Sequence, residues 1–506
     1  MSSFYVENFG CRATQADGAA IEQQLRERGL DRAEAPTGAD FVVLNTCAVT
    51  AAAEQDARAA LRRIRRQNPD CKIVMTGCYA QRAPAEVAAL DGVSHVVGNS
   101  HKHTLAQIAL ARTSETNLSQ IREFIPVSDL EQASANRPRA AEIFVSDIFA
   151  HTELLAAPVF DSANERTRPN LKIQDGCNNR CSFCIIPSLR GRSRSLPVQA
   201  VLREVNQLVA AGYREIVLSG INLGRWGRDL NMEGRASSPV QSSETRRSSI
   251  LSFDDLIRGI LSHTSIDKLR ISSVEPMDWT DSLIRLVAES PRIAKHAHVP
   301  MQSGSDTVLR RMHRKYRPWH YREKIEKIRE VMPDAAIGAD VMVGFPGETD
   351  SEFEETQRMI EDLPFTYLHV FTFSARPGTP AATMPNQVSL HIARERNRIL
   401  RDVAAAKKLA FMHSFIGREL QAITLNVMGR DENGPWTEAL TDNYLKMRIR
   451  GTLEANQWLA AHVVDVENGE VLGIAAAKAE QGFEREQAVE SPPVQPRSGE
   501  RIQPGA

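Results

Sequence analysis

Three cysteines close together in the middle of the chain give the strongest chemical signal in the sequence. Cys177, Cys181 and Cys184 lie within eight residues of one another, in the segment DGCNNRCSFC, directly after a predicted strand. Thiolates at this spacing can converge on one soft metal centre. A tetrahedral zinc site normally takes four ligands, and the nearest downstream histidine is His263. The trio therefore suits a metal cluster that keeps one coordination position open.

A second set of three cysteines is spread through the N-terminal part of the chain. Cys11, Cys47 and Cys78 each follow a predicted strand, at its end or within two residues of it. Because the carboxyl ends of parallel strands lie along one edge of a sheet, these thiols are expected to be neighbours and to form a second three-thiolate site. The alternative is that small residues simply favour strand ends. Cys71 precedes its strand, so we interpret it as an ordinary thiol at the opposite edge.

The elements that must position these thiols are predicted by alternating short apolar runs and amphipathic stretches. At the N-terminus, the runs FYVENFG, FVVLN and KIVMTG alternate with predicted helices at about residues 17–28 and 53–68. This order indicates an open parallel α/β sheet, which we assign to residues 1–112. Residues 113–167 lose the periodicity, and they are predicted to be a linker with one short ordered piece near IFVSDIF.

The remainder of the chain divides into a second α/β region and a small β domain. Six strand-then-helix units in residues 168–402 predict a partial TIM-like (β/α)6 barrel. Within it, residues 229–250 have almost no apolar content and are expected to form a flexible surface insertion. Short alternating runs in residues 413–476 predict a small antiparallel β-barrel, and the polar, Pro-rich residues 477–506 predict a disordered tail.

Composition excludes some classes of protein. No apolar run approaches the roughly 18 residues that a membrane span requires, so no membrane partner is expected. The start, MSSFYVENFGCR, lacks the basic and apolar regions of a secretory signal, which predicts a cytoplasmic protein. With 62 basic and 63 acidic residues, net charge gives no general argument for nucleic acid, and any RNA contact must come from local patches.

The cysteine spacing resembles the signature of the radical S-adenosylmethionine (SAM) superfamily, with Phe183 in the aromatic place before the third cysteine. Further segments together resemble the methylthiotransferase family as far as about residue 475. These segments are GCRATQADGAAIE, NTCAVTAAAEQDAR, GCYAQ, QDGCNNRCSFCIIP, RGRSRS and VMVGFPGETDSEFEET.

This resemblance implies two 4Fe-4S clusters, each held by one cysteine trio, with SAM as the cofactor at the central cluster. It also implies that one SAM methylates a sulfur on the auxiliary cluster, while a second SAM gives the radical that takes hydrogen from the target carbon. The C-terminal β-barrel would be a TRAM domain that contacts RNA.

Within the family, NTCAVT, GINLGRWG, QSGSDTVLRRMHRKY and SARPGTPAA are most similar to the MtaB type. That type methylthiolates N6-threonylcarbamoyladenosine at C2, next to the tRNA anticodon. The alternatives are a methylthiotransferase acting on isopentenyladenosine tRNA, one acting on an aspartate of a ribosomal protein, and a non-catalytic RNA-binding scaffold with zinc at the cysteines. The expected partners are the tRNA anticodon region and a reductant such as flavodoxin or ferredoxin, with no DNA.

The candidate SAM-binding residues are placed by their positions near the carboxyl ends of the predicted barrel strands. They are Phe183, Asn222, Glu275, Gln302 and Asp340. Phe183 could pack on the adenine, and the polar residues could bind the ribose or the amino-acid end. Each polar residue has an alternative role as a helix cap or a hydrogen-bonding strand end.

The candidate RNA-binding residues are basic side chains in two places. One group directly follows the cysteine loop, and the other alternates along one predicted strand of the C-terminal domain, with Tyr444 expected on the same side. The groups are Arg190, Arg192 and Arg194, and Lys446, Arg448 and Arg450. Because the C-terminal domain is acidic as a whole, RNA binding there depends on this single face and on the family resemblance.

Overall fold

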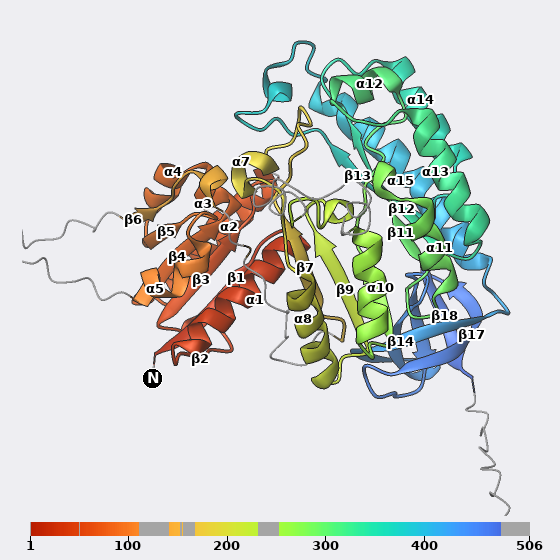
Figure 1. Ribbon diagram of the computed structural model, residues 1–506, viewed down its shortest axis with the longest axis horizontal. Helices are drawn as coiled ribbons and strands as arrows, with labels where there is room; N and C mark the ends of the chain where they lie inside the picture. Colours follow the sequence, from red (N-terminus) through yellow and green to blue (C-terminus); the bar gives the residue numbers. More distant parts are fainter. Residues whose placement is uncertain are drawn as a thin grey trace, which may run out of the picture.

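The computed structural model consists of an N-terminal α/β domain, a central barrel and a C-terminal β-barrel (Figure 1). It describes residues 2–49, 51–110, 141–151, 154, 167–230 and 252–476. The predicted tail at 477–506, nearly all of the predicted insertion at 229–250, and most of the predicted linker lie outside the described residues.

The N-terminal domain is built on a parallel sheet with the strand order β2-β1-β3-β4-β5-β6. Its strands are β1 (Ser3–Asn8), β2 (Asp31–Arg32), β3 (Phe41–Thr46), β4 (Lys72–Gly77), β5 (Val93–Val97) and β6 (Glu142–Phe144). Its helices are α1 (Arg12–Glu27), α2 (Ala51–Gln67), α3 (Cys78–Arg82), α4 (Pro84–Ala88) and α5 (Leu105–Leu110).

Both faces of this sheet are covered by helices, as its continuous apolar strands require. On one face, Leu61 and Ile64 of α2 pack with Val42 and Leu44 of β3. On the other face, α1 and α5 pack against the alternate strand residues. The fold is therefore the open parallel α/β sheet expected from the sequence.

Two local features of this domain differ from the sequence-based expectation. Helix α1 begins at Arg12, directly after Cys11, rather than near Asp17. Strand β6 lies inside the segment interpreted as a linker, yet it pairs in parallel with β5, with His95 opposite Glu142. The ordered piece of the linker is thus a part of the N-terminal sheet.

The central domain contains the six predicted parallel strands. They are β7 (Asn170–Asp175), β9 (Glu215–Gly220), β10 (Lys268–Ile271), β11 (His296–His298), β12 (Ala336–Val343) and β13 (Tyr367–Thr372). Hydrogen bonds join β7-β9-β10 and β11-β12-β13 into two sheets, and a single parallel bridge between Leu269 and Ile293 links them. A short strand, β8 (Arg194–Ser195), runs antiparallel to β7.

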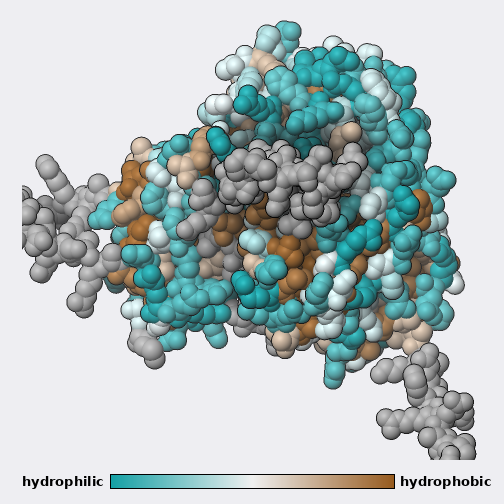
Figure 2. All heavy atoms as spheres, in the orientation of Figure 1, coloured by the Kyte–Doolittle hydropathy of each residue, from teal (hydrophilic) through white to brown (hydrophobic). Residues whose placement is uncertain are grey.

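Helices cover the outside of this partial barrel (Figure 1). The helices of the central domain are α7 (Ile186–Arg190), α8 (Val198–Ala210), α10 (Phe253–His263), α11 (Asp281–Glu289), α12 (Asp306–Arg311), α13 (Pro318–Val331), α14 (Asp350–Asp362) and α15 (Leu390–His413). Figure 2 shows a largely hydrophilic surface over α13 and α14. Among the helices of the described residues, none combines the length and apolar character needed to cross a bilayer.

The two faces of the barrel strands differ in chemistry. Ala297 of β11 and Val299 directly after it belong to the apolar core beneath the helices, whereas His296 and His298 alternate with them and face the lumen. On β12, Asp340 likewise faces inward between two core residues. The lumen of the barrel is therefore polar, which suits it to hold polar ligands rather than to serve as a packed core.

The C-terminal domain is a closed five-stranded barrel in the order β14-β15-β16-β18-β17. Its strands are β14 (Glu419–Asp431), β15 (Gly434–Thr441), β16 (Lys446–Arg450), β17 (Trp458–Glu467) and β18 (Glu470–Ala475). All pairs are antiparallel except β16 and β18, which run parallel.

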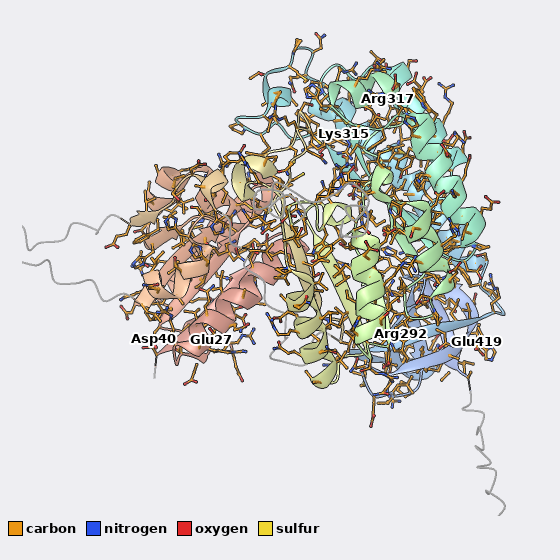
Figure 3. The ribbon with its side chains drawn as sticks, in the orientation of Figure 1. Glu27, Asp40, Arg292, Lys315, Arg317 and Glu419 are labelled. Carbon is orange, nitrogen blue, oxygen red and sulfur yellow. The ribbon has the colours of Figure 1, made fainter. Side chains whose placement is uncertain are left out.

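This small barrel packs against the amino-terminal ends of the central strands. Arg270 of β10 donates hydrogen bonds to the carbonyl oxygens of Asp442 and Thr441, at 3.2 and 3.3 Å. In Figure 3, Arg292 and Glu419 lie at this end, and Lys315 and Arg317 lie at the opposite end. The C-terminal barrel therefore occupies the amino-terminal end of the central barrel, whereas Lys315 and Arg317 lie at the opposite end.

Candidate active site

The central cysteine trio lies in the loop between β7 and α7. Gly176 has a φ of +70° and packs against the backbone of Arg192, so no side chain fits at the start of this loop. Burial raises the pKa of Cys184 to about 12, and the neighbouring thiols of Cys181 and Cys177 add to this rise. The three sulfur atoms thus lie close to one another at the carboxyl end of the first barrel strand.

Nitrogen donors surround these sulfur atoms. The backbone N–H of Asn179 and the side-chain amide of Asn222 donate to Sγ of Cys177, at 3.4 and 3.6 Å. Nη1 of Arg314 donates to Sγ of Cys181 at 3.2 Å. Donors of this kind stabilise the negative charge of thiolates bound to metal.

The N-terminal cysteine trio gathers at the carboxyl edge of the parallel sheet. Cys11 is the residue before α1, Cys47 follows β3, and Cys78 is the first residue of α3 after β4. Burial raises the pKa of Cys47 to about 11, and the thiols of Cys78 and Cys11 raise it further. Chain folding therefore brings together three cysteines that are far apart in the sequence.

Space in this N-terminal site is restricted. A Cβ atom on Gly10, which has a φ of +97°, would lie only 2.8 Å from Sγ of Cys47. Cys47 and Cys78 are buried, whereas Cys11 is exposed. The trio therefore has one open side. Cys71 lies apart from both trios and donates to the carbonyl oxygen of Asn68, in keeping with its interpretation as an ordinary thiol.

Helix α7, which follows the central cysteine loop, packs directly on the N-terminal domain. Leu189 and Ile185 share a core cluster with Cys78 and Tyr79. The amide of Asn99 donates both to the carbonyl oxygen of Leu189, at 2.8 Å, and to Sγ of Cys78, at 3.6 Å. The two thiol sites are thus joined through a single short helix.

A buried charge network holds this interface. Asp17 of α1 contacts three cations, which are Lys102, Lys172 and Arg190. Arg190 also pairs with Asp175, at 2.9 Å, two residues before the first central cysteine. Because the network draws on both domains, it fixes the orientation of the N-terminal thiols relative to the barrel.

The donor sets fit iron–sulfur clusters. Each site offers three soft thiols, and the central site adds N–H donors to sulfur, which is the environment of a cluster with one free corner. Within the described ranges, no three Cys, His, Asp or Glu side chains are placed to share a single metal ion; in a cluster, by contrast, each thiolate binds a different iron. Since several of these thiols have raised pKa values, metal loading must release protons.

The predicted SAM-binding residues lie toward the carboxyl ends of the barrel strands. They differ in whether their side chains already have hydrogen-bond or ionic partners. Asn222 is buried, and its Oδ1 has no hydrogen-bond partner among the described residues. Glu275 is paired with Arg314, and Asp340 lies 3.5 Å from Nε2 of His298. Gln302 has a φ of +64° and uses its backbone to bridge to β12.

Phe183 is half-buried and packs edge-to-face on Phe345, with 6.5 Å between the ring centroids. It therefore lies against the apolar core next to the central cysteines and is partly exposed. Of the candidates, Asn222 carries the clearest sign of a missing ligand, since a buried polar atom without a partner is costly.

The prediction that Arg190 binds RNA is wrong. Its side chain is only 2% exposed and is occupied by Asp17 and Asp175, so it cannot reach a phosphate group. Arg194 is partly buried and donates to the carbonyl oxygens of His151 and Arg190. Arg192 alone of the three is exposed beside the cysteine loop.

The basic strand of the C-terminal barrel alternates as predicted, with three cations on one face of β16, but each cation has an acidic partner. Lys446 pairs with Glu438, Arg448 with Glu470, and Arg450 with Asp431. Arg448 also lies over the ring of Trp436. These pairs reduce the positive potential of the face.

The expected position of Tyr444 on that face is wrong. Its φ of +69° turns the ring toward the central barrel, where it packs at a tilt against His296 with 4.5 Å between the centroids. The reason is the docking of the C-terminal barrel, which uses this ring as a contact rather than leaving it for RNA.

Sequence reasoning gave no role to several residues of the site. Arg314 donates to Cys181 and lies in the segment RRMHRKY. In the sequence this segment shows only a group of basic residues and does not indicate a contact with a cysteine. Asp17 and Asn99 gave no signal at all, because their partners lie far away in the sequence.

A partial (β/α)6 barrel with three cysteines in the loop after its first strand defines the class of radical SAM enzymes. The profile of the Radical SAM superfamily matches residues 171–360, and that of "Uncharacterized protein family UPF0004" matches residues 3–98.

The chain is also similar over most of its length to curated proteins. It is 36% identical to the threonylcarbamoyladenosine tRNA methylthiotransferase MtaB of Bacillus subtilis (strain 168), over 89% of this chain and 91% of that protein. It is 32% identical to the MtaB of Rickettsia prowazekii, over 92% and 95%. The tRNA-2-methylthio-N(6)-dimethylallyladenosine synthase of Thermobifida fusca is 32% identical, over 85% and 79%. The chain belongs to the MtaB family of methylthiotransferases.

Proposed function

We propose that this protein is a cytoplasmic radical SAM enzyme that methylthiolates C2 of N6-threonylcarbamoyladenosine next to the anticodon of tRNA. Membership of the MtaB family supports the reaction and its substrate. The single structural observation that carries the proposal is the pair of three-thiol sites joined through α7. One site is suited to start radical chemistry, and the other is suited to provide sulfur.

The six cysteines of the two trios are proposed as the ligands of two 4Fe-4S clusters. With both clusters and SAM bound, the site would supply reductive cleavage of SAM to a carbon radical and a sulfur atom for insertion. The residues of the chain orient and insulate this chemistry. Asn222 and Arg314 donate to the central thiols, and α7 keeps the two trios at a fixed separation.

The candidate SAM-binding residues Asn222, Glu275, Gln302, Asp340 and Phe183 remain proposals for the cofactor pocket. Their support is their common place above the polar lumen. Asn222 is the best supported, because its buried Oδ1 lacks a partner in the described chain. A ribose hydroxyl or an amino group would satisfy this atom.

For RNA, exposed Arg192 beside the cysteine loop is the proposed phosphate contact near the reacting base. The cations of β16 lie on the separate C-terminal barrel, at the other end of the central strands, where they are suited to a distant part of the same tRNA. A flavodoxin- or ferredoxin-type protein is proposed as the electron donor.

The test is mass spectrometry of tRNA nucleosides from a strain that lacks the gene. We expect the methylthio derivative of threonylcarbamoyladenosine to disappear and to return when the gene is restored. Loss of the methylthio derivative of isopentenyladenosine, or of a methylthio group on a ribosomal protein, would instead assign a different substrate. Purified protein reconstituted without oxygen should hold about eight irons, whereas zinc without iron would indicate a scaffold.

A further inference from the structure

One cation lies directly beside the N-terminal thiols. Arg12 follows Cys11 directly, is exposed, and forms no ion pair in the described part of the chain. It is also the first residue of α1, whose N-cap makes no side-chain hydrogen bond and whose first turn holds no acidic residue. The uncapped N–H groups of this turn add to the positive potential around the guanidinium.

Arg12 lies against the open side of the barrel. Nδ2 of Asn170, the first residue of β7, donates to the carbonyl oxygen of Arg12 at 3.1 Å. The guanidinium is also close enough to help burial lower the pKa values of His296 and His369 in the lumen. Arg12, which is unpaired among the described residues, thus lies between the N-terminal thiol site and the barrel.

The lumen of the barrel contains a cluster of polar rings. Nδ1 of His298 contacts the hydroxyl of Ser273 at 2.7 Å, and the His298 ring lies 5.6 Å from that of His369. His296 contacts the hydroxyl of Tyr367 at 2.7 Å. Such groups can exchange hydrogen bonds with a polar ligand.

One of these residues, His298, shows that the cluster is incomplete. His298 is only 7% exposed, yet its Nε2 has no hydrogen-bond partner among the described residues. Oδ1 of Asp340 lies 3.5 Å away and forms no hydrogen bond with this nitrogen. A buried imidazole nitrogen left in this way favours a ligand that completes it.

The lumen is also accessible. His369 is exposed, and Phe371, two residues further along the same face of β13, is 50% exposed. An exposed aromatic ring beside the barrel entrance is suited to stack on an unpaired base. The cation, the unpartnered imidazole and the exposed ring together describe a pocket for a base that carries a polar, anionic substituent.

We propose that Arg12 binds the carboxylate of the threonylcarbamoyl group of the substrate and selects that group over an uncharged N6 substituent. This inference rests on the proposed function. His298 contacts the carbamoyl or hydroxyl part of the substituent. Asp340 would repel the carboxylate, so the carboxylate lies on the Arg12 side of the pocket. An isopentenyl group would leave both the guanidinium and the imidazole without partners, which explains a preference against it.

The experiment uses protein loaded with both clusters and three anticodon stem-loops. The first carries N6-threonylcarbamoyladenosine, the second carries the same group with its carboxylate converted to a neutral methylamide, and the third carries isopentenyladenosine. Dissociation constants are measured without reductant, so that binding is separated from chemistry, and methylthiolation rates are measured afterwards. Iron content is determined for every variant, because Arg12 adjoins a proposed cluster ligand.

The wild-type protein should bind the carboxylate form about 10- to 100-fold more tightly than the methylamide, as expected for one charge-assisted contact. Arg12→Gln should abolish this difference by weakening binding of the carboxylate form alone. Arg12→Lys should restore part of it. Arg28→Gln, at the exposed opposite end of α1, is the matched control and should retain the full difference.

The inference is overturned if Arg12→Gln, with normal iron content, keeps the preference for the carboxylate form. A separate result bears on the proposed function. If the wild-type protein methylthiolates the isopentenyladenosine stem-loop and not the threonylcarbamoyladenosine stem-loop, the proposed substrate is wrong, and this inference falls with it.

Discussion

Arg190 donates from Nη2 to Oδ2 of Asp17 at 3.0 Å, and both side chains are only 2% exposed. The two residues are 173 positions apart, on the helix after the central cysteine loop and on the first helix of the N-terminal domain. Arg190, which the sequence predicted to be a surface residue that binds RNA, is thus a buried residue whose ion pair links the elements that carry the two thiol sites.

Removing the carboxylate of this ion pair should destabilise the protein. Asp17→Asn leaves the cations Arg190, Lys172 and Lys102 buried with less compensation, which should lower the free energy of unfolding by about 3–5 kcal/mol. Urea unfolding measures the change. Asp31→Asn, at an exposed site in the same domain, is the control and should alter stability by about 0.5 kcal/mol at most. Equal effects of the two substitutions would contradict a role of the network in docking.

The same carboxylate predicts how stability depends on pH. Burial alone would raise the pKa of Asp17, but Arg190, Lys102 and Lys172 outweigh it and hold the pKa well below its usual range. Because the folded pKa is the lower one, the contribution of Asp17 is complete above the unfolded value of about 4 and is lost as the pH falls below it. The stability difference between wild type and Asp17→Asn should therefore be constant from about pH 5 to 7 and shrink below about pH 4. A difference that shrinks toward higher pH would contradict this assignment.

The sequence allowed the main architecture to be predicted because apolar runs mark strands strongly. All six barrel strands, and strands β1, β3 and β4 of the N-terminal sheet, lie where such runs stand. Strand β6 was not recognised, since three residues, EIF, are too few to give a period. The parallel pairing of β16 with β18 was also missed, because alternation reveals which residues share a face but not the direction of a neighbouring strand.

The candidate site was likewise predictable only in part. The cysteines were predictable, since their types and their places at strand ends suffice to bring them together. The burial of Arg190 was not predictable. Arg190 and Arg192 look alike in the sequence, and only the presence of Asp17 in another domain makes one buried and leaves the other exposed. The turn of Tyr444 toward the barrel likewise depends on how the domains dock.

The two cysteine trios should have separable roles. Cys181→Ala should abolish SAM cleavage, whereas Cys47→Ala should leave cleavage intact and stop sulfur insertion. In each variant the iron content should fall from about eight to about four per chain. Cys71→Ala, outside both trios, should retain both activities. Sulfur insertion by the Cys47 variant would refute the assignment of the N-terminal trio to an auxiliary cluster.

Arg314 should tune the central cluster through its contact with Cys181. Its Nη1 donates to Sγ at 3.2 Å, while Nη2 is paired with Glu275, so the guanidinium is held in place against the sulfur. A positive donor stabilises the more negative, reduced state of a cluster, and its loss should make reduction harder. If this charge-assisted contact contributes about 1.4 kcal/mol more in the reduced state, Arg314→Gln should shift the reduction potential by about 60 mV toward more negative values.

Redox titration followed by electron paramagnetic resonance measures this shift. Arg317→Gln, three residues further along and paired with Asp306 instead, is the matched control and should leave the potential unchanged. An unchanged potential in the Arg314 variant at full iron content would show that the contact does not influence the cluster.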